Sequence, residues 1–261
     1  MKKIFWVLGI GLLCLIIVVV LIGIFYIGPF IKIGMEQVGP KVTQVTIKVD
    51  SVDVSLLTGS AKVKGLIVGN PEGYSTPQAI SVGNIAVSID PLSVTSSKIL
   101  IHSVQVESPE ITFEGGLFNG NNLSKILDNV NSFSKNNAPG ANNASANTNT
   151  EGANKPAPKI EVDDFLITGS RVHVHLSKLG NQDISLPDIH LTDLGKDSNG
   201  LTPAELTSAV LGAISKDTLK AVANSVGKLG HGLENFGEGA GNKVGGSVNS
   251  ITSKIGGLFG K

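Results

Sequence analysis

Two histidines, His173 and His175, lie two positions apart in a stretch that alternates apolar and polar residues. Residues two apart in a β-strand point to one face of a sheet, so the pair could provide two ligands of a metal ion. Three further residues could complete such a site: Asp163, Asp164 and His190. The apolar alternation of Val172 and Val174, however, assigns both histidines to the opposite, solvated face. Solvated histidines need no metal, and we predict that none is bound here.

Other residue patterns that would support catalysis are missing from the sequence. It contains no G-x-S-x-G, H-E-x-x-H or G-x-x-x-x-G-K-[ST] motif. The one cysteine, Cys14, lies in the apolar N-terminal run, which excludes thiolate catalysis and cysteine-bound zinc in the rest of the chain. Gly237, Gly239 and Gly241 are spaced like part of a phosphate loop, but no strand precedes them and no lysine follows in place. We therefore predict a protein that is not an enzyme and has no catalytic residue, cofactor or metal.

The charge of the chain is balanced, with 21 basic and 21 acidic residues and a formal net charge of +0. All basic residues except Arg171 are lysines, so bidentate arginine contacts to phosphate are almost unavailable. A nucleic-acid-binding protein would carry a basic surface instead. Nucleic acid is therefore excluded as a partner.

The N-terminal run from Ile4 to Ile31 contains no charged side chain and is flanked by Lys2, Lys3 and Lys32. As a helix it would be about 42 Å long, compared with roughly 30 Å for the hydrocarbon core of a bilayer. No small-residue cleavage site ends the run, so we predict an uncleaved signal anchor. The three residues before the run, which include Lys2 and Lys3, are most easily left in the cytosol. The long body after the run then lies on the other side of the membrane.

Between Val42 and Phe113, apolar and polar residues alternate with a period of two, which predicts strands with one apolar face. The phase of this alternation flips three times, and each flip predicts a bulge or a tight turn. The flips fall between Val49 and Val52, between Val82 and Ile85, and between Ile101 and Val104. Turn signals at Asn70-Pro71 and Asp90-Pro91 separate the strands into a meander. About ten strands in the whole chain would give a sheet some 45 Å wide.

Residues after this block divide into a short helix, a linker and a second strand block. Leu123, Ile126, Leu127 and Val130 share one helical face, and Thr202-Pro203-Ala204-Glu205 is a capping box that predicts the start of another helix. The predicted parts are 1–34, membrane anchor; 35–130, first β block with a short helix; 131–158, disordered Asn/Ala/Pro-rich linker; 159–200, second β block; 201–225, helical segment; and 226–261, Gly-rich amphipathic tail.

The second β block echoes the first. Without gaps, 98–113 (KILIHSVQVESPEITF) matches 159–174 (KIEVDDFLITGSRVHV) in its apolar positions, which we interpret as a repeated hairpin unit. In the tail, Gly237, Gly241 and Gly245 are four residues apart, a spacing that allows another helix to approach closely. Self-association through the tail, binding of the tail to a membrane and a flexible end are the alternatives for this segment.

Several segments in order resemble the AsmA-like envelope proteins over about residues 35–225. They are Gly59–Tyr74 (GSAKVKGLIVGNPEGY), Ala86–Ser93 (AVSIDPLS), Lys98–Ile101, Ser108–Ile111, Asn121–Leu123, Ser185–Gly195 and Leu201–Glu205. The resemblance implies a single-pass anchor in the bacterial inner membrane and a β-rich body in the periplasm. It also implies a role in envelope biogenesis, with outer-membrane assembly and, in long members, phospholipid passage along a hydrophobic groove. Expected partners are membrane lipid, other envelope proteins, or a second copy through the tail.

The expected fold is an N-terminal transmembrane helix followed by an α+β domain, with a single curved, groove-like, mainly antiparallel sheet and C-terminal helices. Fourteen apolar strand residues are candidates for the groove lining: Val45, Ile47, Val63, Ile67, Val87, Ile89, Ile99, Ile101, Ile111, Phe113, Ile160, Val162, Val172 and Val174. The alternative is a non-lipid, structural or protein-binding β-sandwich of the stress-associated, LEA-like type, tethered to the membrane. In such a sandwich two sheets pack face to face and leave no groove.

Overall fold

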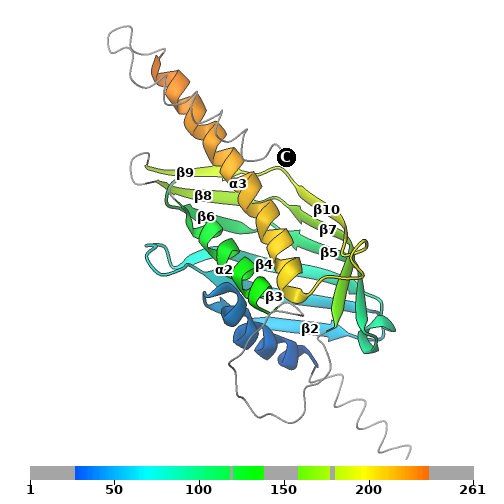
Figure 1. Ribbon diagram of the computed structural model, residues 1–261. Coiled ribbons are helices and arrows are strands. Elements are labelled where there is room, and N and C mark those ends of the chain that lie inside the picture. Colours follow the sequence, from blue (N-terminus) through cyan, green and yellow to red (C-terminus); the bar gives the residue numbers. More distant parts are fainter. Residues whose placement is uncertain (1–26, 118–119, 138–157, 177–179, 235–261) are drawn as a thin grey trace, which may run out of the picture.

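The alternating segments form one mixed β-sheet with helices on one of its faces (Figure 1). The computed structural model describes residues 27–117, 120–137, 158–176 and 180–234. The strands are β1 (Ile47–Lys48), β2 (Ser51–Ser55), β3 (Ser60–Gly69), β4 (Gln78–Ile89), β5 (Lys98–Glu107), β6 (Glu110–Glu114), β7 (Lys159–Thr168), β8 (Arg171–Leu176), β9 (Gly180–Ser185) and β10 (Ile189–Leu194). The helices are a segment at 27–43, a short 3-10 turn η1 (Ser93–Thr95), α2 (Asn122–Asn136) and α3 (Pro203–Glu234).

The ten strands occupy only six positions across the sheet, because four pairs of consecutive strands are the two halves of one bent strand. β1 and β2 both pair with β3, and β5 and β6 both pair with β4. In the same way, β7 and β8 pair with β5 and β6, respectively. On their other side, β7 and β8 pair with β10 and β9. Six positions make the sheet about 24 Å wide. The expected width of some 45 Å is therefore wrong.

The sequence echo between the two blocks corresponds to parallel pairing rather than to a repeated hairpin. Lys98 lies beside Lys159, and Ile111 lies beside Val172, in the register of the gapless match. Both bent strands turn at equivalent positions, where Ser108 and Gly169 have positive φ angles of 48° and 64°. The remaining strand pairs are antiparallel, so the sheet is mainly antiparallel with a parallel centre. A parallel pair needs a long crossover, and α2 lies within it.

The three predicted phase flips coincide with irregularities of the sheet. The flip at Val49 and Val52 falls in the break between β1 and β2. At the second flip, β4 changes its partner from β6 to β5. The third flip lies opposite a register shift between Ser88 and Ile89. Each irregularity returns the apolar side chains to the helix-covered face, where Val82, Ile85, Ile101 and Val104 all belong to one hydrophobic cluster.

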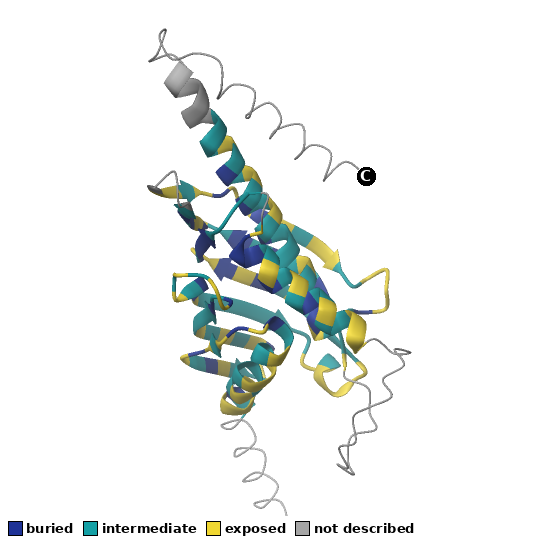
Figure 2. Cartoon of the chain, turned by 60° about the vertical axis from the view of Figure 1, so that its left-hand side comes forward, coloured by how far each residue is buried: buried dark blue, intermediate teal, exposed yellow. Residues whose placement is uncertain are grey.

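The helices form a layer over the apolar face of the sheet, and buried residues are concentrated beneath α2 and α3 (Figure 2). Asn121 caps α2, since its side chain accepts a hydrogen bond from the Ser124 N–H at 2.8 Å. The buried residues of α2 include Leu123, Ile126 and Val130, as the predicted face requires. α2 continues past residue 130 to Asn136, and α3 is one helix that continues past residue 225 to Glu234. Residues 138–157, the rest of the predicted linker, lie outside the described residues.

The described strands all belong to a single sheet, so the two-sheet sandwich expected under the alternative interpretation does not form in this part of the chain. The segment at 27–43 is helical and packs on the body, although residues up to 34 were assigned to the anchor. Within the described ranges, no helix is both long and apolar enough to cross a membrane. Residues 1–26, which hold most of the predicted anchor, are outside those ranges.

Candidate functional site

An apolar pocket of about 360 Å³ lies between the helix at 27–43, the N-terminal half of α3 and the sheet. The helix at 27–43 lines it with Met35, Gly39 and Thr43. α3 lines it with Leu206, Thr207, Val210, Leu211 and Ile214. The floor consists of Ile47, Leu66, Val68, Ile80, Val82, Ile85, Val106, Pro109, Ile111, Phe165 and Ile167. The pocket is therefore a gap in the helical layer through which part of the apolar face remains accessible.

The helical wall at 27–43 is held against the bent edge strand, by hydrogen bonds to the break between β1 and β2 and by packing on β1. The Lys32 ammonium donates to the Asp50 carbonyl at 3.1 Å, and the Glu36 carboxylate accepts from the Val49 N–H at 2.9 Å. Near the end of the helix, the Asn129 side chain of α2 donates to the Thr43 carbonyl at 3.0 Å. Gly39 has no side chain, and a Cβ there would lie 2.8 Å from the Ile47 side chain. This close packing fixes the first wall of the pocket against the sheet edge.

The second wall is fixed by the capping box of α3, whose prediction is confirmed. The Glu205 N–H donates to the Thr202 hydroxyl at 3.2 Å, and the Glu205 carboxylate accepts from the Thr202 N–H at 2.7 Å. The hydrogen bonds that the Glu205 carboxylate accepts from the Thr202 N–H and from the Thr202 hydroxyl, the latter at 2.9 Å, lower the pKa of Glu205. One turn further on, the Ser208 hydroxyl donates to the Asn131 side chain at 2.5 Å and joins α3 to α2. α3 thus begins at a defined residue and presents Leu206, Val210 and Ile214 to the pocket.

The chemistry of the pocket is restricted by its lining. None of the described residues that line it carries a charge, and only Thr43 and Thr207 have polar side chains. Both hydroxyls donate within their own helices, Thr43 to the Gly39 carbonyl and Thr207 to the Pro203 carbonyl, each at 2.8 Å. A polar ligand would lose its hydration without compensation in such a site. The pocket suits an apolar chain or ring, and its volume falls within the range of small-ligand sites.

The fourteen predicted groove residues divide into three groups. Six are buried in the core: Val45, Ile111, Phe113, Val162, Val172 and Val174. Four are partly buried against that core: Ile47, Val87, Ile101 and Ile160. The other four, Val63, Ile67, Ile89 and Ile99, are half-buried outside the core cluster. Only Ile47 and Ile111 border the pocket. The remaining lining residues were not among the candidates.

His173 and His175 lie on the face away from the helices, opposite the buried Val172 and Val174, and His173 pairs with carboxylates of neighbouring strands. His173 contacts Asp183 at 2.7 Å and Glu110 at 2.5 Å, and hydrogen bonds to these two carboxylates raise the pKa of its imidazole. The predicted completing residues are paired elsewhere, Asp163 with His102 and Asp164 with His190. The described residues contain no group of three or more histidine, cysteine, aspartate or glutamate side chains placed to hold a metal ion.

Two segments that carried the family resemblance meet in a polar network at one end of the sheet. The Asn122 amide donates to the Asn70 side chain at 2.8 Å and to the Thr112 carbonyl at 2.7 Å. Next to it, the Glu114 carboxylate accepts from the backbone N–H groups and hydroxyls of Ser75 and Thr76 at 2.5–2.9 Å. Burial opposes ionisation of Glu114, but these hydrogen bonds outweigh it and lower the pKa to about 2. The network joins the β3–β4 loop to the start of α2 and has a structural role.

Replacing Glu114 by glutamine should lower the free energy of unfolding by about 2 kcal/mol at pH 7, because charge-assisted hydrogen bonds are lost. The folded-state pKa lies below the unfolded value, so this stabilisation is present above pH 5 and is lost as pH falls toward 2. Urea unfolding of the wild type and of Glu114→Gln at pH 7 and pH 2.5 checks the prediction. Glu72→Gln, on the same loop but exposed, is the control. A difference between wild type and Glu114→Gln that does not change with pH would contradict this role.

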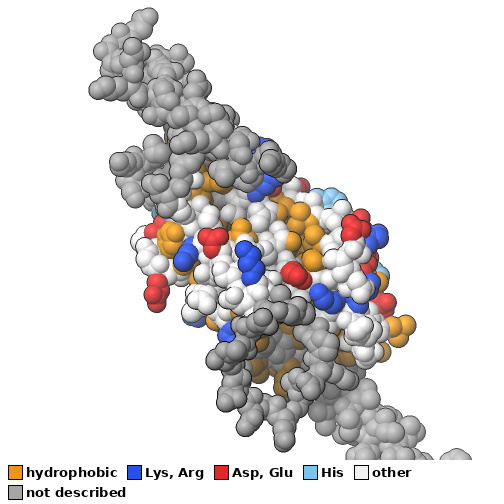
Figure 3. Space-filling model, viewed as in Figure 1, with side chains coloured by type: hydrophobic (Ala, Val, Ile, Leu, Met, Phe, Trp, Pro, Cys, Tyr) orange, Lys and Arg blue, Asp and Glu red, His pale blue; other side chains and the backbone are white. Residues whose placement is uncertain are grey.

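The first residues of the predicted Gly-rich tail, 226–234, belong to α3, and the rest of it, with the predicted helix-contact glycines Gly237, Gly241 and Gly245, lies outside the described residues. On the helix-covered face, charged side chains are scattered rather than gathered into a patch (Figure 3). A comparison of the chain with protein-family models, curated proteins and solved structures finds no match.

Proposed function

We propose that this chain is a membrane-anchored, AsmA-like protein of the bacterial envelope, and that its pocket holds an apolar chain of a membrane lipid. The observation that carries the proposal is the uncharged lining of the pocket between the helix at 27–43 and α3. Among the described residues, the lining contains no ionisable group, and the hydroxyls of Thr43 and Thr207 donate within their own helices, so the pocket offers binding but no acid or base. The proposed role is therefore to hold lipid during envelope biogenesis, without catalysis.

The sequence supports attachment to a bilayer even though the helix at 27–43 packs on the body. Residues 4–26 remain without a charged side chain, and as a helix they would be about 34 Å long. This length still exceeds the roughly 30 Å of the hydrocarbon core. In the proposed arrangement these residues form a single span in the inner membrane, and the body lies in the periplasm. The pocket, which begins at Met35, is then held close to the lipid surface.

The apolar lining also supports reversible exchange of lipid. An acyl chain in the bilayer is already out of water, so moving it into an apolar pocket changes its exposure to water little. Removing a CH₂ group from water is worth roughly 0.8 kcal/mol in the bilayer and in the pocket alike, so these two terms largely cancel when the chain moves from one to the other. Loading and release can then occur without an energy source. A sheet about 24 Å wide does not bridge two membranes by itself, which favours holding lipid over passing it across the envelope.

Photo-crosslinking tests the proposal in the full chain. The protein would be reconstituted in vesicles that contain a phospholipid with a diazirine in its acyl chain, irradiated and digested, and its crosslinked peptides identified by mass spectrometry. We expect crosslinks in residues 1–26, which serve as the internal positive control, and also in pocket peptides around Ile80–Ile85 and Leu206–Ile214. Crosslinks confined to the N-terminal residues would show that no lipid enters the pocket.

A further inference from the structure

One end of the sheet carries the two most exposed large hydrophobic side chains among the described residues. Leu57, in the β2–β3 turn, is 89% exposed, and Leu92, in the β4–β5 loop, is 86% exposed. Val94 of the same loop is also exposed. The two loops are joined, since the Ile89 N–H donates to the Gly59 carbonyl at 2.7 Å. Leu57, Leu92 and Val94 are referred to below as the apolar tip.

Asp90, the first residue of the β4–β5 loop, is the one charged residue of the two loops that carry the apolar tip. No other charged residue occurs between Asp53 and Lys62 or between Asp90 and Lys98. Exposed loops of a protein surrounded by water are usually polar or charged. A single exposed leucine on such a loop is nevertheless common and needs no explanation. Here three exposed apolar side chains occur together on two joined loops whose one charged residue, Asp90, lies next to the end of β4. This combination fits contact with an apolar phase.

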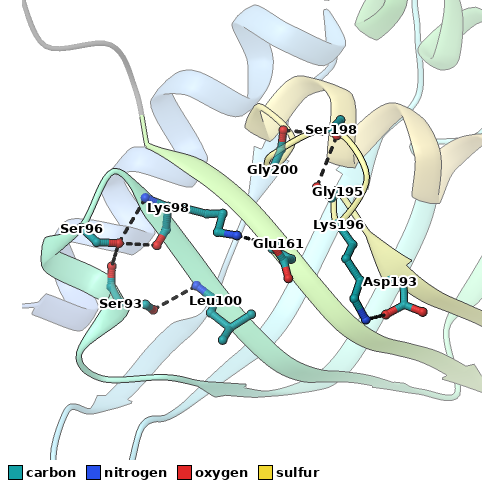
Figure 4. A network of polar contacts seen from close by, with 10 residues as sticks. All are labelled: Ser93, Ser96, Lys98, Leu100, Glu161, Asp193, Gly195, Lys196, Ser198 and Gly200. Atoms are coloured by element: carbon teal, nitrogen blue, oxygen red, sulfur yellow. Dashed lines mark hydrogen bonds and ion pairs between the residues drawn. The ribbon is translucent and has the colours of Figure 1, made fainter.

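Hydrogen bonds of Ser93 and Ser96 pair polar groups within the β4–β5 loop (Figure 4). The Ser93 hydroxyl donates to the Asp90 carbonyl at 2.7 Å and accepts from the Leu100 N–H at 2.9 Å. The Ser96 hydroxyl donates to the Ser93 carbonyl at 2.8 Å and accepts from the Lys98 N–H at 3.1 Å. Backbone groups that are already paired can leave water at a low cost. The loop is therefore built to enter a region with little water.

The helix at 27–43 starts toward this same end of the molecule. Its Gly39 packs on Ile47 at the start of β1, whereas Gly28 packs on the Val52 carbonyl in β2, which runs toward Leu57. The uncharged residues 4–26 therefore join the body on the side of the apolar tip. The first turns of the helix add further exposed apolar surface, with Phe30 at 70% and smaller contributions from Ile31 and Ile33.

We propose that the apolar tip inserts into the interface of the same membrane that residues 4–26 span. The partner is a lipid surface, and the tip provides a second contact beside the anchor. One flexible attachment leaves a body free to rotate, whereas two attachments at one end hold the strands at a defined angle to the bilayer. The proposal rests on the membrane placement stated above, but it does not depend on lipid entering the pocket.

Depth-dependent fluorescence quenching tests this contact in the full chain. Trp6→Phe removes the one native tryptophan, and Leu92→Trp then places a probe at the tip. In phosphatidylcholine/phosphatidylglycerol vesicles with bromine on the acyl chains, the probe should be quenched about twofold, since interfacial apolar groups lie roughly 5–10 Å into the headgroup boundary. Glu72→Trp, on the exposed β3–β4 loop at the opposite end of β3, is the control and should not be quenched. Quenching is independent of orientation because both leaflets carry bromine.

Adding Leu57→Asp to the Leu92→Trp probe should reduce its quenching toward the control, because a charge on the neighbouring loop opposes insertion. Equal quenching of the Leu92→Trp and Glu72→Trp probes in vesicle-bound protein would overturn the tip contact alone. Flotation of the vesicles distinguishes this result from failure of the anchor. A chain that does not float with vesicles would contradict the membrane placement and the tip contact together.

Discussion

Replacing Leu123 by alanine is expected to lower the free energy of unfolding by about 3 kcal/mol, as for other buried leucines whose removal leaves a cavity. Leu123 lies in the first turn of α2 and is only 3% exposed. It belongs to the same cluster as Ile111 and Phe113 of β6, which α2 contacts directly. Because α2 lies in the crossover between the parallel strands, loosening it weakens the connection between the two blocks. Urea unfolding of the full chain in a mild detergent measures the change.

Leu57→Ala is the matched control, since it removes the same atoms from a side chain that is 89% exposed. A surface substitution of this kind should change the free energy of unfolding by less than about 0.5 kcal/mol. Similar losses for Leu123→Ala and Leu57→Ala would contradict the burial of α2 against the sheet. A loss in Leu123→Ala alone confirms that this helix is part of the core.

Local patterns in the sequence predicted most of the elements. The alternation of Ile111 with Phe113 and of Val172 with Val174 identified strands and their apolar face, because side chains in a strand alternate strictly. The capping box at Thr202 located the start of α3 for a similar reason, since its hydrogen bonds join residues three apart. The gapless match of the blocks even contained the pairing register, but a pattern of apolar positions does not distinguish parallel from antiparallel neighbours.

The pocket could not be predicted, because its position depends on where helices leave the sheet uncovered. Ile111 and Phe113 are two residues apart on one face of β6, yet only Ile111 borders the pocket. The helix at 27–43 supplies one wall with Met35, Gly39 and Thr43, but residues up to 34 had been assigned to the anchor and the rest of this helix to the first β block. Long-range packing of Met35 and Gly39 opposite Val210 has no local signature in the sequence. The same limit applies to the apolar tip, where the joining of two turns brings Leu57 and Leu92 to one end.

Occlusion of the pocket should prevent lipid from entering it. Val210→Trp adds a large side chain to α3 on the face that lines the pocket, whereas Ala209→Trp adds the same side chain at the neighbouring exposed position. Excluding an acyl chain should lower occupancy at least about tenfold, equivalent to 1.4 kcal/mol. Both variants should retain the helix, since tryptophan is tolerated within helices at a cost below about 0.7 kcal/mol. Their unfolding midpoints establish that both proteins are folded.

The most direct measurement is the ratio of acyl-diazirine crosslinks at Ile80–Ile85 to those in residues 1–26, compared in the wild type, Val210→Trp and Ala209→Trp. The β4 residues border the pocket and are unchanged in both variants, so their labelling reports occupancy. If the pocket holds lipid, the ratio falls about tenfold in Val210→Trp and stays at the wild-type value in Ala209→Trp. A ratio that is the same in all three proteins, or a wild type without crosslinks in β4, would contradict lipid binding by this pocket.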